Sequence, residues 1–302
     1  MKYFVFSTGS NPSLVKEIIK KSSHLKLGSV IIDRYQDGEI MVHLKEAVNG
    51  QRVYVLGSSF PPASNVLKLI ILINTLKANG AKEIILLIPY FGYGKQDRVK
   101  YSGDALSAKL MVDVIRLAGV KKTIALDLHS QMVEKYFKNP LVHLNSYLLF
   151  ATYFKKLIKV KDDWLVVAPD KGGEKRAQVI AQRLGYQKVT IINKVRPQVD
   201  RVKIISITGE VKNKHIIIND DMCQTGGTLI AAAKGLKALG AKDIYVSFTH
   251  LLPTGPAIAN LLKDKNIKQV VFTNSVEIPK GMIKNKKFQQ LSCASLFFKQ
   301  IK

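Results

Sequence analysis

Short runs of β-branched and aromatic residues alternate with helical patterns along almost the whole chain, and this alternation limits the possible folds more than any other feature. The runs include "SVIIDRY", "RVYVLGS", "EIILLIPY", "TIALDLHS", "WLVVAPD", "KVTIINK", "HIIINDD", "DIYVSFTH" and "QVVFTNS". Strands that alternate with helix-sized segments are typical of α/β units. The pattern therefore predicts an α/β fold with mainly parallel sheets flanked by helices.

An internal repeat adds a second constraint. The segment "LKANGAKEIILL" begins at Leu76, "LKALGAKDIYVS" begins 160 residues later at Leu236, and "LAGVKKTIAL" at Leu117 is a looser copy. Each copy has the pattern of a helix that ends at Gly and is followed by a strand. The two close copies predict two similar domains in tandem, joined near "KNPLVHLNSY". We expect domains at residues 1–145 and 146–302, with the last helix a candidate to pack back on the first domain.

Composition narrows the class of protein further. A chain of 302 residues that is 47% hydrophobic can form a core in each of two domains. No apolar run reaches the roughly 18 residues of a membrane span, and "MKYFVFSTGSNP" is more typical of a first strand than of a signal peptide. We therefore expect a cytoplasmic protein with no membrane partner. Cys223 and Cys293 are too few for a disulfide framework and match no zinc pattern, so we expect two buried thiols.

The net charge of +25 raises the question of nucleic-acid binding. Most of the 47 basic residues are Lys, scattered in ones and twos, with no stripe of Arg alternating with aromatic residues. A solvated Lys-rich surface, or attraction for anionic ligands such as phosphorylated metabolites, accounts for this charge. A nucleic-acid-binding protein is the least favoured alternative, and its binding would weaken steeply as salt rises. We expect no nucleic-acid partner.

The stretch "IIINDDMCQTGGTLI" combines two adjacent carboxylates with a small-residue turn. Asp220 and Asp221 precede Gly226 and Gly227, after which the sequence becomes helical. Glycines let backbone N–H groups approach an anion closely, and the start of a helix adds its dipole. Carboxylates accept hydrogen bonds from sugar hydroxyls or bind a cation. The stretch therefore predicts a ligand with both phosphate and hydroxyl groups, and it lacks the Lys and the spacing of a Walker P-loop.

Three further strand ends carry polar residues, and ligands bind beyond the carboxyl ends of strands in open parallel sheets. "DLHS" contains His129 and "APDKGG" contains Asp170. A lone His at a strand end is either a hydrogen-bonded structural residue or a ligand. In "TIINKVRPQV", Lys194 and Arg196 are two residues apart, and so on one face if the strand persists. From the residues alone they are either a paired anion site or two more surface cations.

With these motifs in order, the chain resembles the ribose-phosphate diphosphokinase (ribose-phosphate pyrophosphokinase) family. The turn at 224–228 alone also resembles type I phosphoribosyltransferases, but other blocks resemble the diphosphokinases along nearly the full length: "SNPSL", "RYQDGE", "IPYFGYGKQDR", "DLHS", "APDKGG", "NKVRP", "THLLPTGPA", "TNSVEIP" and "LSCASLF". The resemblance implies two tandem type I phosphoribosyltransferase-like domains. It also implies transfer of the β,γ-diphosphoryl group of Mg-ATP to the C1 hydroxyl of ribose 5-phosphate, giving 5-phosphoribosyl 1-diphosphate and AMP for nucleotide biosynthesis.

The same resemblance assigns roles to individual residues. The catalytic pair is Lys194 and Arg196, in a mobile loop, and the ligands of Mg²⁺ are His129 and Asp170. The residues implied for ATP are Tyr35, Asp37, Gly38, Glu39, Lys95 and Gln96. Those implied for ribose 5-phosphate are Arg196, Asp220, Asp221, Gln224, Thr225, Gly226, Gly227 and Thr228. Since the family supplies "RYQDGE" across a subunit interface, we expect a homo-oligomer that is at least a dimer, with a hexamer as the larger candidate.

The chain departs from the family pattern at several positions. Gln224 stands where most relatives have Asp or a small hydroxyl residue, and Lys95 stands where they have Arg, which loses a bidentate fork. "VKYSGDALS" lacks the usual charges of the regulatory loop, and Asn79-Gly80 replaces a Ser-Ala type pair, which argues against control by phosphate and ADP. Two related alternatives remain: a non-catalytic associated subunit, which need not keep Lys194, and a base-salvaging phosphoribosyltransferase, which would leave "RYQDGE" without a role.

Overall fold

The chain forms two compact units, which the computed structural model describes over residues 2–198, 201–207, 209–253, 256–279 and 281–301. The side chains of residues 193–198 and 201–206 are outside this description. No helix in the described ranges is both long and apolar enough to cross a membrane. The N-terminal unit comprises Met1–Asn145, Ser275–Glu277 and Ser292–Lys302, and the C-terminal unit comprises Ser146–Asn274 and Ile278–Leu291.

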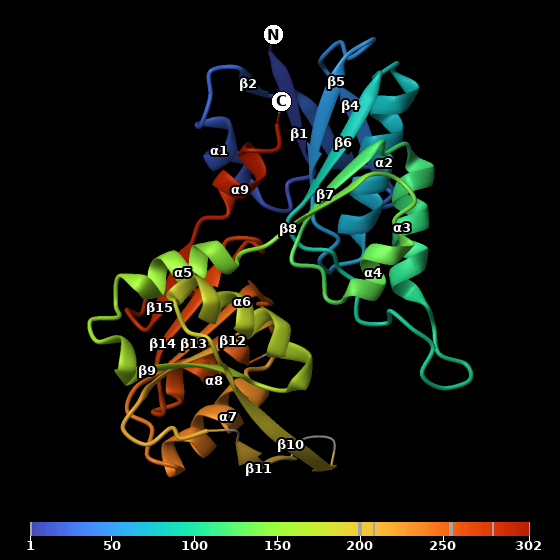
Figure 1. The fold of residues 1–302 in the computed structure, drawn as a ribbon. Coiled ribbons are helices and arrows are strands. Elements are labelled where there is room, and N and C mark those ends of the chain that lie inside the picture. The colour runs from blue at the N-terminus through green and yellow to red at the C-terminus, as the bar shows by residue number, and fades with distance from the viewer. Residues whose placement is uncertain (1, 199–200, 208, 254–255, 280, 302) are drawn as a thin grey trace. The chain divides into compact units, whose positions relative to one another are not determined.

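The N-terminal unit contains a sheet of six parallel strands in the order β2-β1-β5-β6-β7-β8. Residues such as Val53 and Val55 face a core formed with α2 and α3, while the alternate residue Tyr54 is buried on the opposite side. Figure 1 shows α1 and α9 on the other side of this sheet from α2 and α3. The bounds are β1 Tyr3–Ser7, α1 Pro12–Ile19, β2 Leu25–Leu27, β5 Arg52–Leu56, α2 Ser64–Ala78, β6 Glu83–Ile88, α3 Ser107–Ala118, β7 Lys122–Leu126, α4 Gln131–Tyr136, β8 Leu141–Leu144 and α9 Ala294–Phe298.

A separate antiparallel hairpin carries the "RYQDGE" segment. Strands β3 (Val30–Arg34) and β4 (Ile40–Leu44) pair in their own two-stranded sheet. The run "SVIIDRY" therefore does not enter the parallel sheet, because the five residues between the two strands are too few for a crossover connection. Alternate residues such as Ile32 and Val42 pack on the core of the unit. The turn at Tyr35–Glu39 lies at the tip of this hairpin, where Gly38 and Glu39 line a pocket together with Ser64 and Leu67 of α2.

The C-terminal unit contains a seven-stranded sheet in the order β11-β10-β9-β12-β13-β14-β15, in which only β11 is antiparallel to its neighbour. One face packs on α5 and α6 and the other on α7 and α8 (Figure 1). The bounds are α5 Tyr147–Lys155, η1 Lys161–Asp163, β9 Trp164–Ala168, η2 Lys171–Gly173, α6 Glu174–Leu184, β10 Thr190–Gln198, β11 Arg201–Ile207, β12 His215–Cys223, α7 Gly227–Ala238, β13 Ile244–Leu251, α8 Ala257–Lys263, β14 Ile267–Thr273 and β15 Phe288–Leu291.

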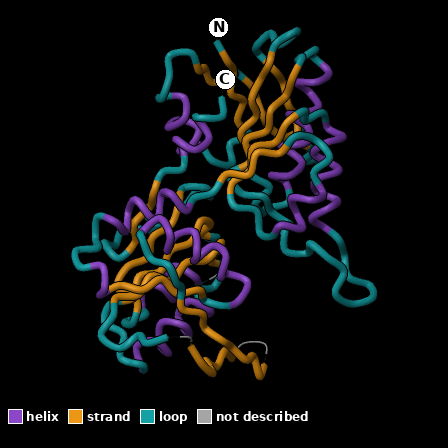
Figure 2. Tube along the Cα trace, viewed as in Figure 1, coloured by secondary structure: helices purple, strands orange, loops and turns teal. Residues whose placement is uncertain are grey.

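The internal repeat of the sequence is also a structural repeat. Gly80 and Gly240 end α2 and α7 with φ of 81° and 86°, a conformation that favours glycine. Each donates its N–H to a Lys carbonyl three residues earlier at 3.0 Å, and the following Ala donates to a Leu carbonyl at 3.1 Å. Figure 2 shows helices beside the strands in both units. The predicted α/β class with two mainly parallel sheets is confirmed.

Candidate active site

Asp220 and Asp221 lie near the carboxyl end of β12, which ends at Cys223. The preceding Ile216–Ile218 are fully buried between the two helical layers, so the strand is firmly held. Asp221 is only 5% exposed, whereas Asp220 is more accessible. The Asp221 N–H donates to Asp220 Oδ1 at 2.9 Å, which draws the first carboxylate back over the strand. The pair therefore lies at the edge where parallel α/β sheets bind ligands.

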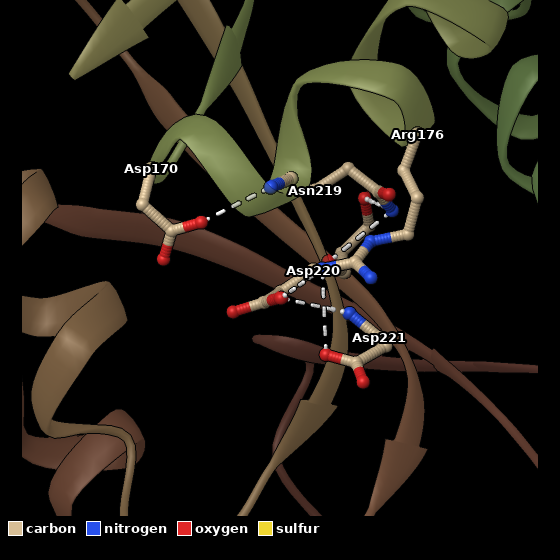
Figure 3. A network of polar contacts seen from close by, with 7 residues as sticks. Asp170, Arg176, Asn219, Asp220 and Asp221 are labelled. Atoms are coloured by element: carbon tan, nitrogen blue, oxygen red, sulfur yellow. Dashed lines mark hydrogen bonds and ion pairs between the residues drawn. The ribbon is translucent and has the colours of Figure 1, made fainter. Parts of the chain in front are cut away.

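Arg176 from α6 lies against both carboxylates, as Figure 3 shows. Its Nη2 is 3.0 Å from Asp220 Oδ1 and 3.5 Å from Asp221 Oδ1. The side chains of all three residues are less than a fifth exposed. The sequence analysis missed Arg176, although it lies only three residues past the glycines of "APDKGG". Its cation explains how two adjacent carboxylates can be kept in a protein interior.

One arginine does not fully compensate two carboxylates. Burial, followed by the charge of Asp221, raises the pKa of Asp220 to about 7, although Arg176 opposes the shift. At neutral pH this carboxyl therefore lies near the midpoint of its titration. A bound cation or sugar hydroxyls would favour its ionised form, because a cation stabilises the negative charge and a hydroxyl donates a hydrogen bond to the carboxylate.

The turn from β12 to α7 is exposed and has the geometry of an anion loop. Gly226 has φ of 78°, and α7 begins at Gly227. Gln224, Thr225 and Gly227 are exposed, and the Gly227 N–H lies 3.3 Å from Thr225 Oγ1. Asn260 of α8 donates to the Thr225 carbonyl at 3.1 Å and so braces the turn. The first N–H groups of α7 are thereby presented at an accessible helix start.

Cys223 precedes this turn but is unsuited to nucleophilic chemistry. Its thiol is buried, and its carbonyl accepts the N–H of Leu252 at 2.9 Å. Burial, together with the nearby charge of Asp220, raises the pKa of the Cys223 thiol to about 12. The thiol stays protonated at neutral pH, and Cys293 is buried as well. The expectation of two buried thiols is thus confirmed.

Asp170 follows β9 and caps the short helix η2. Its Oδ1 accepts the N–H of Gly173 at 3.0 Å (Figure 3). The described part of the chain holds no group of three or more His, Cys, Asp and Glu residues suited to a metal ion. Mg²⁺ is nonetheless usually held by one or two protein groups together with substrate phosphates. Asp170 is a partly exposed carboxylate at the carboxyl edge of the sheet, and it fits that mode of binding.

Lys194 and Arg196 both lie in β10, opposite β11 in an antiparallel pair. Lys194 pairs with Ile204, and the register shifts on either side of Lys194 and Val195. The backbone here forms a hairpin of two strands where the family resemblance implies a loop. The side chains of Lys194 and Arg196 lie outside the described residues, so their predicted placement on one face stays a prediction.

In the N-terminal unit, the residues predicted for the ATP base lie at the tip of the β3–β4 hairpin. Tyr35, Asp37 and Glu39 are exposed, and Gly38 has φ of 94°. Tyr35 donates its N–H to the Glu39 carbonyl at 2.9 Å, and Asp37 Oδ1 accepts the Glu39 N–H at 3.0 Å. The turn is therefore closed by its own residues and presents an aromatic ring beside two carboxylates.

The "GKQD" segment lies at the carboxyl edge of the same unit. Lys95 and Gln96 are exposed, and Gln96 Oε1 accepts a hydrogen bond from Ser107. The adjacent Asp97, which the sequence analysis did not single out, is buried and accepts two hydrogen bonds from Arg98 at 3.1 Å and another from Ser130. The Arg98 hydrogen bonds, the largest cause, lower the pKa of Asp97 to about 2. Asp97 therefore stays ionised and anchors this segment to the one that contains His129.

His129 lies in the segment that follows β7 and is half-buried. Gly94 packs close to it, since a Cβ on Gly94 would be 3.8 Å from the His129 Cβ. The structure thus brings "GYGKQD" and "DLHS" together within the N-terminal unit. It likewise brings Asp170, Asp220 and the 224–228 turn to one edge of the C-terminal unit. Roles for these residues in catalysis or binding remain predictions.

Comparison with known proteins matches both units to one kind of enzyme. Residues 3–119 match the model of the N-terminal domain of ribose phosphate pyrophosphokinase, and residues 133–285 match the phosphoribosyl transferase domain. The chain is 37% identical over 294 residues to the ribose-phosphate pyrophosphokinase of Fusobacterium nucleatum, covering 97% of this chain and 92% of the relative. It is 35% identical over 298 residues to that of Bacillus subtilis, covering 98% and 92%.

A solved structure agrees with these sequence relatives. The phosphoribosylpyrophosphate synthetase from Mycobacterium smegmatis matches with a TM-score of 0.90 at 27% identity, covering 99% of this chain and 97% of that one. The predicted phosphoribosyltransferase-like character of the fold is thereby confirmed.

Proposed function

The chain belongs to the ribose-phosphate pyrophosphokinase family, and we propose that its two units divide the two substrates of that reaction between them. In the reaction, the C1 hydroxyl oxygen of ribose 5-phosphate attacks the β-phosphorus of ATP. The bond from that phosphorus to the oxygen bridging to the α-phosphorus breaks, and the hydroxyl proton is released. The products are 5-phosphoribosyl 1-diphosphate, for nucleotide biosynthesis, and AMP.

The C-terminal unit binds ribose 5-phosphate. The 5-phosphate of the sugar accepts hydrogen bonds from backbone N–H groups of Gln224–Thr228, and the ring hydroxyls donate hydrogen bonds to Asp220 and Asp221. The observation that carries this assignment is the carboxylate pair held by Arg176 immediately before an exposed glycine turn at the start of α7. A sugar phosphate has both kinds of group, so it uses the whole edge.

The N-terminal unit binds ATP. Tyr35 stacks on the base, Asp37, Gly38 and Glu39 border its amino group, and Lys95 with Gln96 reach the nucleotide. The exposed tip of the hairpin supports this role, because Tyr35 is 57% exposed and its ring is available to a ligand. As the resemblance implies that this segment serves a neighbouring subunit, the working form is a homo-oligomer, at least a dimer, acting in the cytoplasm.

Lys194 and Arg196 are proposed to contact the transferring diphosphoryl group, where positioned cations stabilise the charge of the transition state. Arg196 also contacts the sugar phosphate. His129 and Asp170 would hold Mg²⁺ together with ATP phosphates, and the ion would neutralise phosphate charge when bound.

The test is AMP formation from Mg-ATP with and without ribose 5-phosphate, comparing the parent protein with Lys194→Ala. We expect sugar-dependent AMP in the parent and a fall of about 10³-fold in the variant. Equilibrium ATP binding should stay within a few-fold, because Lys194 acts in the transition state. The matched control is Lys188→Ala, an exposed lysine just before β10, which should retain the parent rate.

Either of two results would contradict this proposal. Folded, ATP-binding protein that makes no sugar-dependent AMP would favour a non-catalytic associated subunit. An equal loss in Lys188→Ala and Lys194→Ala would indicate general surface charge as the cause and remove the specific role of Lys194.

A further inference from the structure

The segment 127–130, which contains His129, is held by β8 in an unusual way. In a strand, successive N–H groups point in opposite directions. Here the N–H of Asp127 donates to the Leu144 carbonyl and the N–H of Leu128 donates to His143 Nε2, both at 2.9 Å. Asp127 has φ of 39°, in the left-handed region, so the chain turns sharply and both N–H groups face β8. A side chain thus replaces the strand carbonyl at the end of the ladder.

The second ring nitrogen of His143 has its own partner. Nδ1 lies 3.0 Å from Glu134 Oε1 on α4. Because Nε2 accepts the Leu128 N–H, the ring proton must be on Nδ1, from which it donates to Glu134. The His143 side chain is 21% exposed and Glu134 35%, so the contact is partly shielded from water. The carboxylate therefore fixes both the tautomer and the plane of the imidazole.

The other end of the segment is held independently. Ser130 Oγ accepts the N–H of Met132 at 3.2 Å and so caps α4, and the same hydroxyl donates to the buried Asp97. His129 therefore lies between two fixed neighbours, Leu128 and Ser130. Displacing either neighbour changes the direction in which the His129 side chain points.

We propose that His143, oriented by Glu134, is a positioning residue that holds the Leu128 amide and thereby presents His129 to the substrates. This inference rests on the proposed function only in that His129 is placed at the active site. The hydrogen-bond relay from Glu134 through His143 to the backbone is assigned from the structure alone. Removing such a supporting contact typically lowers activity by about 10- to 100-fold.

The first experiment measures sugar-dependent AMP formation in His143→Ala and His143→Gln. We expect the Ala variant to lose about 10- to 100-fold in rate and the Gln variant to recover most of it, because Gln Oε1 can accept the same N–H. His24→Ala, an exposed histidine of the same unit, is the matched control and should be unchanged. Equal losses in the Ala and Gln variants, with lower thermal unfolding temperatures in both, would overturn the proposal in favour of a purely structural role.

A double-mutant cycle with His129→Ala tests whether His143 acts through His129. If it does, adding His143→Ala to His129→Ala changes the rate by less than about 3-fold. Multiplicative losses would overturn the proposal, since they would show that the two residues act separately. A full-rate His129→Ala would instead remove His129 from the proposed active site.

Hydrogen–deuterium exchange of the peptide covering residues 127–130 provides a readout that does not depend on activity. Protection of the Leu128 amide should be lost in His143→Ala and regained in His143→Gln. This holds even if the parent makes no AMP, so failure of the proposed function and failure of the relay are distinguishable. Unchanged protection in His143→Ala would overturn the relay itself.

Discussion

The two units carry different polar residues at the carboxyl ends of two corresponding strands, β5 and β12. In the N-terminal unit, the connection from β5 to α2 contains two buried serines, Ser58 and Ser59. Ser58 Oγ donates to Asn11 Oδ1 at 2.8 Å, and Ser59 Oγ accepts the Gly92 N–H at 2.7 Å. In the C-terminal unit, the two carboxylates lie near the end of β12, and the connection to α7 is the exposed turn at Thr225. The first connection is closed by its own hydrogen bonds, whereas the second remains accessible to a ligand.

The helix ends that precede β6 and β13 are nearly identical, with the same hydrogen bonds at Gly80 and Gly240. Such junctions depend on a few neighbouring residues, so both units keep them. The connections at the carboxyl edge are not needed for sheet pairing and can differ without loss of the fold. The shared fold therefore does not decide which unit binds a ligand at this edge.

The two units also differ in the pKa of an acidic residue near the carboxyl edge of the sheet. Asp97 in the N-terminal unit accepts hydrogen bonds from Arg98 and Ser130, and its pKa is lowered to about 2. Asp220 in the C-terminal unit shares one arginine with Asp221, and burial raises its pKa to about 7. The first carboxylate is stabilised as an anion by the fold, and the second is not.

The largest expected effect comes from removing the shared cation with Arg176→Met. Asp220 and Asp221 would then be buried without this cation, and we expect the C-terminal unit to lose about 3 kcal/mol of unfolding free energy at pH 8. The loss should shrink at pH 5, where Asp220 takes up a proton. Urea unfolding followed by the fluorescence of Trp164 measures this, because the chain has one Trp and it lies in this unit.

The control for that experiment is Arg183→Met, on the same helix but exposed. It should change the unfolding free energy by less than about 0.5 kcal/mol. Equal losses in the two variants would show that Arg176 does not compensate the carboxylates.

The next expected effect is that the stability contributions of Asp220 and Asp97 depend on pH in opposite directions. The folded-state pKa of Asp220 is above its ordinary value of 3.8, so its contribution to stability is fully present below about pH 3.8 and is lost as pH rises through about 7. The slope for one proton is at most about 1.4 kcal/mol per pH unit. Asp220→Asn should abolish this fall between pH 4 and 7 in Trp164-detected urea unfolding.

Asp97→Asn is the matched variant, and it should change the pH dependence of stability in the opposite direction. The pKa of Asp97 is lowered, so its contribution is present above about pH 3.8 and is lost as pH falls toward about 2. Its removal should therefore destabilise the protein at pH 7 and have little effect near pH 2. The same pH trend in both variants would contradict the contrast between the two carboxylates.

The smallest expected effect is a difference between Gly226, in the turn before α7, and Gly240, at the end of α7. Gly226→Ala and Gly240→Ala both place a Cβ at positive φ, which costs about 1 kcal/mol of stability. At Gly226 the new Cβ would lie 3.2 Å from Leu261 Cγ in the turn before α7, and at Gly240 it would lie 3.2 Å from Lys212 Cγ, far from that turn in sequence.

Steady-state kinetics should therefore distinguish the two variants. The KM for ribose 5-phosphate should rise about 10-fold in Gly226→Ala, equivalent to about 1.4 kcal/mol, and stay unchanged in Gly240→Ala. An unchanged KM in Gly226→Ala would remove the turn from the sugar phosphate site.

Much of the candidate site could be predicted because its motifs are continuous in sequence. The carboxylates, the glycine turn and "DLHS" each occupy one short stretch, and each lies where a parallel strand ends, as expected. Arg176 and His143 could not be found in this way, because they act on residues from other elements. Lys194 and Arg196 remain predictions from sequence alone, since their side chains lie outside the described residues.

The fold class, the repeat and the motifs could be predicted from local sequence patterns, because hydrophobic period, helix-ending glycines and turn residues act over a few positions. Which side chains meet depends on how distant parts of the chain pack against one another. Arg176 and Asp220 are 44 residues apart, and Glu17 of α1 contacts Ser292 from a position 275 residues away. Such contacts depend on the order of the strands and on how the helices pack over them, which local sequence patterns do not encode. The partners of each carboxylate are therefore visible only in the folded chain.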